Sequence, residues 1–192
     1  MSLRITAGAR RGFSLFSLPG KATRPMGERA RQAVFNLLGN RVGGAVVLDL
    51  FAGSGALSLE ALSRGAASAV LVENSPAAVD VIGRNIDKLE FGDHARLLRS
   101  DAFRIGGSHL RGFDLIFCDP PYEMVGSVTP DSTFGQFLAS LLERDILKST
   151  GIVVLGHHKE SEIVGPLGNL CLSDRRNYGT NGVSFFTVCA PS

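Results

Sequence analysis

Short apolar runs that alternate with helical patterns place the strongest constraint on the fold of this chain. The run AVVLDLF (45–51) is continuous and apolar, as expected for a strand buried on both faces of a parallel sheet. A helical pattern follows it at 55–64. The other predicted elements are strands at 69–73, 95–99, 113–119, 151–157, 170–176 and 184–189, and helices from Ser75-Pro76 and over 133–145. This alternation predicts a doubly wound α/β sheet, whose ligands bind beyond the carboxyl ends of its strands.

Size and composition are those of an ordinary globular domain with a short appendage. The chain has 192 residues, of which 44% are hydrophobic and 20% charged, and it contains no run of about eighteen uncharged apolar residues. Its first residues, MSLRITAGARRG, lack the apolar stretch of a secretory signal. The three cysteines form no C-x-x-C pair, which argues against a disulfide framework or a zinc site and favours a reducing cytoplasm. Cys118 is expected in the core.

The charge of the chain is distributed unevenly. Residues 1–42 hold eight Arg or Lys and one acid, a net charge of +7, whereas residues 43–192 hold twelve bases and seventeen acids, a net charge of −5. We therefore expect a basic N-terminal extension, made of two short strands around a Gly/Arg turn and a helix that ends at Gly39, followed by a main domain over 43–192. A polyanionic partner would meet the extension, although a solvated basic face is an equally simple interpretation. The candidate contacts are Arg10, Arg11, Arg24, Arg29 and Arg31.

A glycine-rich turn directly follows the first buried strand. Gly53 and Gly55 permit a tight turn and close approach of a ligand to the backbone where a helix begins. A dinucleotide fingerprint would need a third glycine, and Asp49 would lie poorly beside a pyrophosphate. A carboxylate suits a cationic ligand, so the turn favours S-adenosylmethionine, which carries a sulfonium and an ammonium, over NAD. The candidate cofactor residues are Asp49, Phe51, Ala52, Gly53, Ser54, Gly55, Glu73, Asn74, Asp101 and Ala102.

Two further acids follow the next two predicted strands. Glu73 ends the strand at 69–73 and can accept hydrogen bonds from ribose hydroxyls. Asp101 can accept from an adenine amino group while Phe103 packs nearby, or it can cap a short helix. Three acids after three successive strands indicate a nucleoside site more strongly than any one of them alone.

The tetrapeptide Asp119-Pro120-Pro121-Tyr122 follows the strand at 113–119 and is the candidate catalytic element. Two prolines hold the backbone extended, so that the Asp119 carboxylate and the Pro120 carbonyl can act as preorganised acceptors. An exocyclic amino group is a poor nucleophile because its lone pair is delocalised into the ring. Two acceptors on its two hydrogens would localise that lone pair and stabilise the positive charge that develops as a methyl group arrives. Tyr122 offers a face on which an unstacked base can lie. No metal is required.

These motifs resemble the bacterial small-subunit (16S) ribosomal RNA guanine-N2 methyltransferase family, of the RsmD type. The resemblance covers nearly the whole chain and rests on RITAGARRG (4–12), RPMGERARQAVFNLL (24–38), VLDLFAGSGALSLEALSRGA (47–66), VEN (72–74), SDAF (100–103) and FDLIFCDPPY (113–122). The N-terminal stretches are the specific part, because amino methyltransferases acting on DNA and protein also carry DPPY. Where the family commonly has an acidic residue after the fifth strand, this chain has Gly156-His157-His158.

The resemblance implies a Rossmann-like class I methyltransferase fold with seven strands, one of them antiparallel. It implies S-adenosyl-L-methionine as the cofactor and S-adenosyl-L-homocysteine as the product, bound at the Asp49–Gly55 turn, Glu73 and Asp101, and catalysis at 119–122. It also implies that the extension over 1–42 contacts ribosomal RNA in the small subunit and that 43–192 is the catalytic domain. We expect a cytoplasmic monomer.

Other interpretations remain open at this point. A DNA adenine-N6 methyltransferase would use the same tetrapeptide, but 192 residues leave little chain for a separate DNA-reading domain. A non-catalytic RNA-binding or ribosome assembly factor on this scaffold is the alternative from another class. His157 and His158 could edge a pocket but are expected in solvent, and Tyr178 could touch RNA or only shape a turn.

Overall fold

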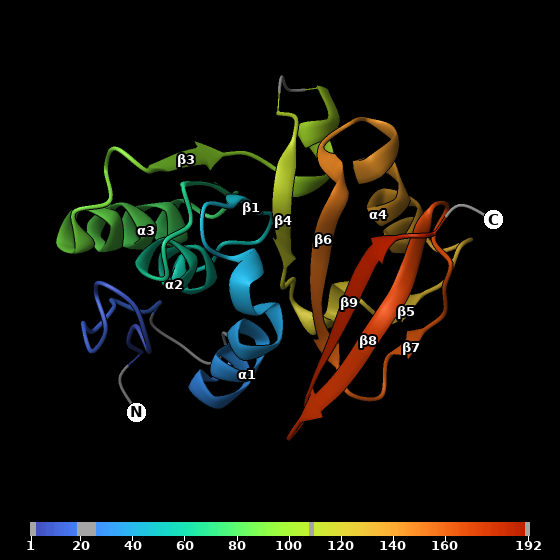
Figure 1. Ribbon diagram of the computed structural model, residues 1–192, viewed down its shortest axis with the longest axis horizontal. Helices are drawn as coiled ribbons and strands as arrows, with labels where there is room; N and C mark the ends of the chain where they lie inside the picture. Colours follow the sequence, from blue (N-terminus) through green and yellow to red (C-terminus); the bar gives the residue numbers. More distant parts are fainter. Residues whose placement is uncertain (1–2, 19–25, 108–109, 191–192) are drawn as a thin grey trace. The chain divides into compact units, whose positions relative to one another are not determined.

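The computed structural model describes residues 3–18, 26–107 and 110–190, which fold into two compact units, Met1–Ala102 and Phe103–Ser192. Seven strands belong to a mostly parallel sheet, as the strand–helix alternation predicts. The two units are described separately below, and Figure 1 labels their elements. The α/β class and the single antiparallel strand, β9, are confirmed.

The first unit contains three parallel strands in the order β3-β2-β1, with helices packed on them. Leu48 and Leu71 are fully buried on β1 and β2, because helices cover the sheet. In chain order the elements are α1 (Glu28–Leu38), the 3₁₀ turn η1 (Gly39–Arg41), β1 (Val46–Asp49), α2 (Ala56–Ser63), β2 (Ser68–Glu73), α3 (Pro76–Leu89) and β3 (Ala95–Arg99). Pro76 begins α3 at the predicted place, where the missing amide of a proline costs nothing.

The N-terminal segment of this unit is a hairpin with one antiparallel bridge, between Arg4 and Ser14, rather than two full strands. It is fastened to α2 by the buried carboxylate of Glu60. That carboxylate accepts the backbone amides of Thr6 and Ala7 at 2.8 and 3.0 Å and the Thr6 hydroxyl at 2.6 Å. Because the side chain of Glu60 satisfies the amides of Thr6 and Ala7, these two residues need no partner in a β-ladder.

The second unit contains the strand order β4-β6-β9-β8. β6 runs parallel to β4, and β9 runs antiparallel to both β6 and β8, so that β8 and β9 form the long hairpin drawn in red in Figure 1. The elements are η2 (Ala102–Gly107), β4 (Phe113–Cys118), η3 (Tyr122–Met124), β5 (Ser127–Val128), α4 (Thr133–Glu143), β6 (Leu147–His158), β7 (Glu162–Ile163), β8 (Leu170–Tyr178) and β9 (Asn181–Val188).

One expectation about the cysteines is confirmed and another is wrong. Cys118 is buried in β4, as expected for a core residue. Cys171 and Cys189, however, form a disulfide between β8 and the end of β9, with a Cα–Cα distance of 5.0 Å. Counting and spacing of cysteines missed this pair, because the hairpin brings together residues that lie 18 apart in the sequence. Among the described residues no helix is long and apolar enough to cross a membrane.

Candidate functional site

The carboxyl ends of β1, β2 and β3 lie at one edge of the first unit's parallel sheet, and the predicted cofactor residues lie there. Asp49 is the last residue of β1 and Glu73 the last of β2, while Asp101 follows β3 by two residues. The glycine-rich turn lies between β1 and α2. It begins with Phe51 and the buried Ala52 and continues through Gly53 and Ser54 to Gly55, which precedes α2. Asn74 is exposed just after β2, and Ala102 is buried at the start of η2.

The two glycines of the turn adopt left-handed backbone conformations, with φ of +56° at Gly53 and +79° at Gly55. Other L-residues rarely adopt this region, so the turn depends on glycine at both positions. A Cβ at Gly53 would meet nothing within 4 Å, so the backbone there is open to a ligand. A Cβ at Gly55 would lie 3.2 Å from both Leu59 and Leu71, which shows how closely the turn packs against α2 and β2.

The Glu73 carboxylate ties this turn to the end of β2. One oxygen accepts the amide of Gly53 at 2.9 Å, and the other accepts the amides of Asn74 and Ser75, each at 2.9 Å. A carboxylate has about four acceptor positions, so three backbone amides leave room for about one further donor. Glu73 therefore shapes the turn as well as offering an acceptor, which the sequence alone did not indicate.

Two residues that the sequence analysis missed support the same turn. Ser58, on α2, donates its hydroxyl to the buried carboxylate of Asp49 at 3.0 Å. Asn85, fully buried on α3, donates to the carbonyl of Ser54 at 2.8 Å and also brackets the backbone of Phe16, accepting its amide at 2.7 Å and donating to its carbonyl at 3.0 Å. In the sequence, the only indication of this role of Asn85 was an asparagine on the apolar face of a helix.

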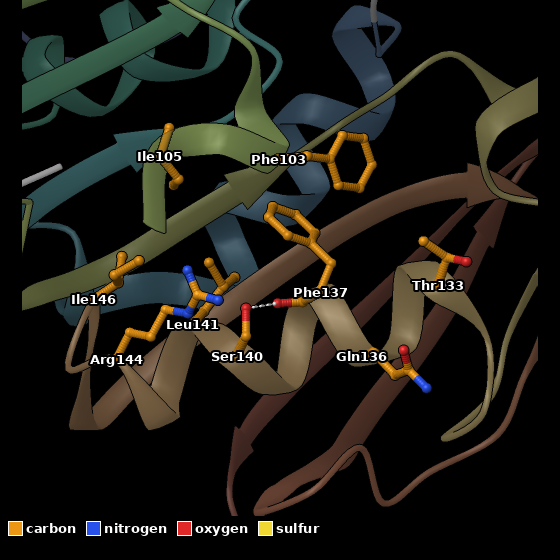
Figure 2. Close-up of a pocket in the computed structure, with 9 residues that line it drawn as sticks. All are labelled: Phe103, Ile105, Thr133, Gln136, Phe137, Ser140, Leu141, Arg144 and Ile146. Atoms are coloured by element: carbon orange, nitrogen blue, oxygen red, sulfur yellow. Dashed lines mark hydrogen bonds between the residues drawn. The ribbon is translucent and has the colours of Figure 1, made fainter. Parts of the chain in front are cut away.

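Asp101 and Phe103 lie on either side of the boundary between the two units. The Phe103 ring packs on α4 of the second unit, 4.6 Å from the Phe137 ring and 5.9 Å from the Phe134 ring. Figure 2 shows the hollow that opens beside it, with a volume of about 280 Å³, between the Phe103 and Phe137 rings and the side chains of Leu141 and Arg144. Phe103 is thus an exposed aromatic residue at the rim of a hollow.

The candidate catalytic tetrapeptide follows β4 directly, with Pro120 buried and Asp119, Pro121 and Tyr122 half-buried. β6 runs beside β4 with Cys118 opposite Leu155, so the next residues, Asp119 and Gly156, are neighbours. A Cβ on Gly156 would lie 1.9 Å from Oδ1 of Asp119 and 2.8 Å from its Cγ. The Asp119 carboxylate therefore packs directly against the backbone of Gly156, where any side chain would displace it.

The Tyr122 side chain is held by the second unit's sheet. Its hydroxyl donates to Oδ1 of Asn181, the first residue of β9, at 2.5 Å. Its ring makes an edge contact with the imidazole of His158, with 5.8 Å between the ring centroids. Burial, and then the negative charge of Asp119, raise the pKa of Tyr122, so its phenol stays protonated at neutral pH.

The expectation that His157 lies in solvent is wrong. His157 has no exposed surface, and its two ring nitrogens contact the carbonyl of His158 at 2.7 Å and the hydroxyl of Ser184 at 2.9 Å. Burial lowers the pKa of His157, so the ring is neutral and structural at neutral pH. β6 continues one residue beyond the predicted strand at 151–157, so His157 lies within the strand rather than at its end. His158 is half-buried at the strand end.

The predicted RNA-binding arginines divide into three groups. The expectation for Arg31 is wrong, because its guanidinium is fully buried on α1, 3.5 Å from Glu60 and bonded to the carbonyl of Arg4. Arg10 binds the C-terminal end of α3, where it donates to the carbonyl of Leu89 at 2.8 Å and pairs with Glu90 at 2.6 Å. These two residues fasten the extension to the first unit. Sequence charge alone cannot distinguish such anchors from surface charges.

The remaining arginines are Arg11, Arg24 and Arg29. Arg11 and Arg29 are exposed, on the hairpin and on the first turn of α1. Arg24 lies outside the described residues. Two basic side chains of α3 lie over the ring of exposed Phe16, with Arg84 3.9 Å and Lys88 4.9 Å from the ring centroid. Arg84 and Lys88 are therefore exposed basic residues outside residues 1–42 that contact the N-terminal segment, which their sequence position in a helix did not indicate.

This chain is similar to proteins that are named as ribosomal RNA methyltransferases. Residues 3–187 match the family described as Conserved hypothetical protein 95. A Bacillus subtilis protein named "Putative rRNA methyltransferase YlbH" is 33% identical over 96% of this chain and 98% of its own length. The ribosomal RNA small subunit methyltransferase D of Escherichia coli is 38% identical over 62% of this chain and 60% of its own length.

Among solved structures, an RNA methyltransferase from Salinibacter ruber in complex with S-adenosyl-L-homocysteine is similar in fold. Its TM-score is 0.65, its sequence identity is 16%, and the match covers 88% of this chain and 96% of that protein. At this identity the likeness establishes the fold alone.

Proposed function

Since this chain belongs to the Conserved hypothetical protein 95 family, whose members include ribosomal RNA small subunit methyltransferase D, we propose that it transfers a methyl group from S-adenosyl-L-methionine to the exocyclic N2 amino group of a guanine in small-subunit ribosomal RNA. The observation that carries the proposal is the Asp119–Tyr122 tetrapeptide at the end of β4, with its carboxylate supported by Gly156. We further propose that the protein acts as a monomer in the cytoplasm.

The residues of the first unit fit the proposed cofactor. Asp49, Glu73 and Asp101 place three carboxylates at one sheet edge, which complements a ligand that carries a sulfonium and an ammonium. The backbone at Gly53 is open, so a ligand can approach it closely. When bound, S-adenosyl-L-methionine supplies a methyl group activated by the positive charge on sulfur.

The residues of the second unit would hold the accepting amino group. Asp119 and the carbonyl of Pro120 accept its two hydrogens, which turns its lone pair towards the methyl carbon. The Asp119 carboxylate would stabilise the positive charge that develops on the amino nitrogen as that nitrogen accepts the methyl group. The Tyr122 ring offers a stacking face that recovers about 1–3 kcal/mol of the cost of unstacking the base. Holding the reactants in line supplies much of the remaining rate enhancement.

The proposal is tested with labelled S-adenosyl-L-methionine and three substrates, namely unmodified small ribosomal subunits, naked small-subunit RNA and duplex DNA. The expected product is a single N2-methylguanine in the RNA, identified by mapping the labelled nucleotide. Label on the N6 of adenine in DNA would contradict the proposal and favour a DNA methyltransferase. Binding of RNA without any transfer would favour a non-catalytic assembly factor.

Glu73→Ala is expected to weaken cofactor binding about 10- to 100-fold, the effect of losing hydrogen bonds to a charged group. The substitution removes both the acceptor for a ribose hydroxyl and the anchor of the Gly53 amide. Titration calorimetry with S-adenosylhomocysteine measures the affinity. Asp80→Ala, at an exposed position of α3, is the matched control and should bind normally. An unchanged affinity in folded Glu73→Ala protein would remove Glu73 from the site.

Replacing Arg11 and Arg29 together with alanine is expected to weaken RNA binding and to flatten its salt dependence. Each lost phosphate contact to single-stranded RNA should reduce the slope of log K against log salt by about 0.7. Binding assays over a range of salt concentrations measure the slope, and cofactor affinity should not change. Arg96→Ala, on exposed β3 outside the extension, serves as the control. A wild-type slope in the double variant would mean that Arg11 and Arg29 are ordinary surface charges.

A further inference from the structure

The β8–β9 hairpin brings an asparagine to the candidate catalytic tyrosine. Asn181 begins β9 and lies opposite His158 of β6 in the sheet register. Its side-chain oxygen accepts the hydroxyl hydrogen of Tyr122, a residue 59 positions earlier in the chain, and the His158 ring lies in a T-shaped arrangement with the Tyr122 ring. Asn181 and His158, which are neighbours in the sheet, therefore both contact the Tyr122 side chain. Asn181 contacts its hydroxyl, and His158 contacts its ring.

These two contacts fix the plane of the Tyr122 ring. A tyrosine side chain has two soft torsions, and a hydrogen bond at its hydroxyl together with a T-shaped contact with another ring restricts both. The hydroxyl carries a single hydrogen, which it donates to Asn181. The phenol therefore presents its ring face and oxygen lone pairs to a ligand rather than a proton. A preset ring orientation lowers the cost of placing a base on it.

We propose that Asn181 is a positioning residue for the methyl acceptor, which fixes through its hydrogen bond to Tyr122 the ring face on which the target base stacks. The role rests on the proposed function, since it requires that a base occupies the site beside Tyr122. Asn181 itself contacts no reacting atom. It sets the geometry of a residue that does.

The hydrogen bond can be tested without any substrate, because the chain has two tyrosines, Tyr122 and Tyr178, and no tryptophan. In a Tyr178→Phe background the ultraviolet absorbance of tyrosinate reports the ionisation of Tyr122 alone. The charged and titratable groups that face Tyr122 are Asp119 after β4 and His158 on β6. Asn181→Ala is expected to lower the pKa of Tyr122, because it removes an acceptor that favours the protonated phenol and admits water. Asn181→Asp is expected to raise that pKa, because it adds a negative charge.

A general loosening of the unit would not shift the pKa of Tyr122 in opposite directions in these two variants. An unchanged titration of Tyr122 in both variants would show that the hydrogen bond is absent in solution and would overturn the proposal. Asn177→Ala is the matched control, since Asn177 is exposed on β8 of the same hairpin, and it should leave the titration unchanged.

Single-turnover methylation tests the positioning role. Asn181→Ala and Tyr122→Phe are each expected to slow methyl transfer about fivefold, the effect of one net hydrogen bond, with cofactor affinity unchanged. The double variant is expected to be no slower than either single variant, because both remove the same interaction. Tyr122→Ala, which also removes the stacking face, should lose far more activity.

The outcomes separate the two proposals. Wild-type protein that methylates no nucleic acid would overturn the proposed function, and the positioning role with it, while the Tyr122 titration still decides whether the hydrogen bond exists. Wild-type activity together with wild-type rates in Asn181→Ala, or with additive losses in the double variant, would overturn the positioning role alone.

Discussion

Asp119→Ala is expected to slow methyl transfer by a factor on the order of 10²–10³, the usual loss for one preorganised electrostatic partner. The substitution removes the acceptor on the amino group and the negative charge opposite the cation that develops on nitrogen. Cofactor affinity should change little, because the proposed cofactor residues lie at the ends of β1, β2 and β3 in the other unit. Single-turnover rates with saturating cofactor and RNA isolate the chemical step.

Two further variants sharpen this experiment. Asp119→Asn keeps one acceptor oxygen but removes the charge, so we expect partial activity between that of the wild type and Asp119→Ala. Asp131→Ala, at an exposed position before α4, is the control for removing an acid from the second unit. If Asp119→Ala transferred methyl at the wild-type rate, the two-acceptor mechanism would be wrong and the tetrapeptide would be only a rigid turn.

Gly156→Ala is expected to slow methyl transfer about 10- to 100-fold, a loss about tenfold smaller than that expected for Asp119→Ala. The new Cβ would lie 1.9 Å from Oδ1 of Asp119, a distance that atoms cannot adopt, so the carboxylate must move. The position is within β6, where alanine is tolerated by the backbone. The measurement is again the single-turnover rate, with cofactor affinity as the quantity that should stay constant.

Gly126→Ala is the matched control, because a Cβ there would meet nothing within 4 Å. Overpacking typically costs about 1–3 kcal/mol of stability, so Gly156→Ala should also unfold at a lower denaturant concentration. In an Asp119→Ala background this loss of stability should largely disappear, because the carboxylate that clashes with the new Cβ is gone. A Gly156→Ala enzyme with wild-type rate and stability would show that the carboxylate does not rest on Gly156 in solution.

Local sequence determined most of the secondary structure of this protein. The apolar run at 45–51, the glycines after it and the Ser75-Pro76 step each act within a few residues, and β1, the Gly53–Gly55 turn and α3 formed where they predict. The tetrapeptide after β4 and the acids after β1, β2 and β3 were identified in the same way, because a doubly wound sheet places its strand ends at one edge.

What the tertiary structure decided is which partner each side chain meets. Arg31 and Arg11 have the same chemistry and lie 20 positions apart, yet Arg31 is buried against Glu60 and Arg11 is exposed, because α1 turns one of its faces inward. The hydrogen bond between Asn181 and Tyr122, the close packing of Asp119 on Gly156, and the Cys171–Cys189 bond all join segments that are distant in the sequence. Such contacts depend on sheet register, a long-range property that composition and local spacing do not encode.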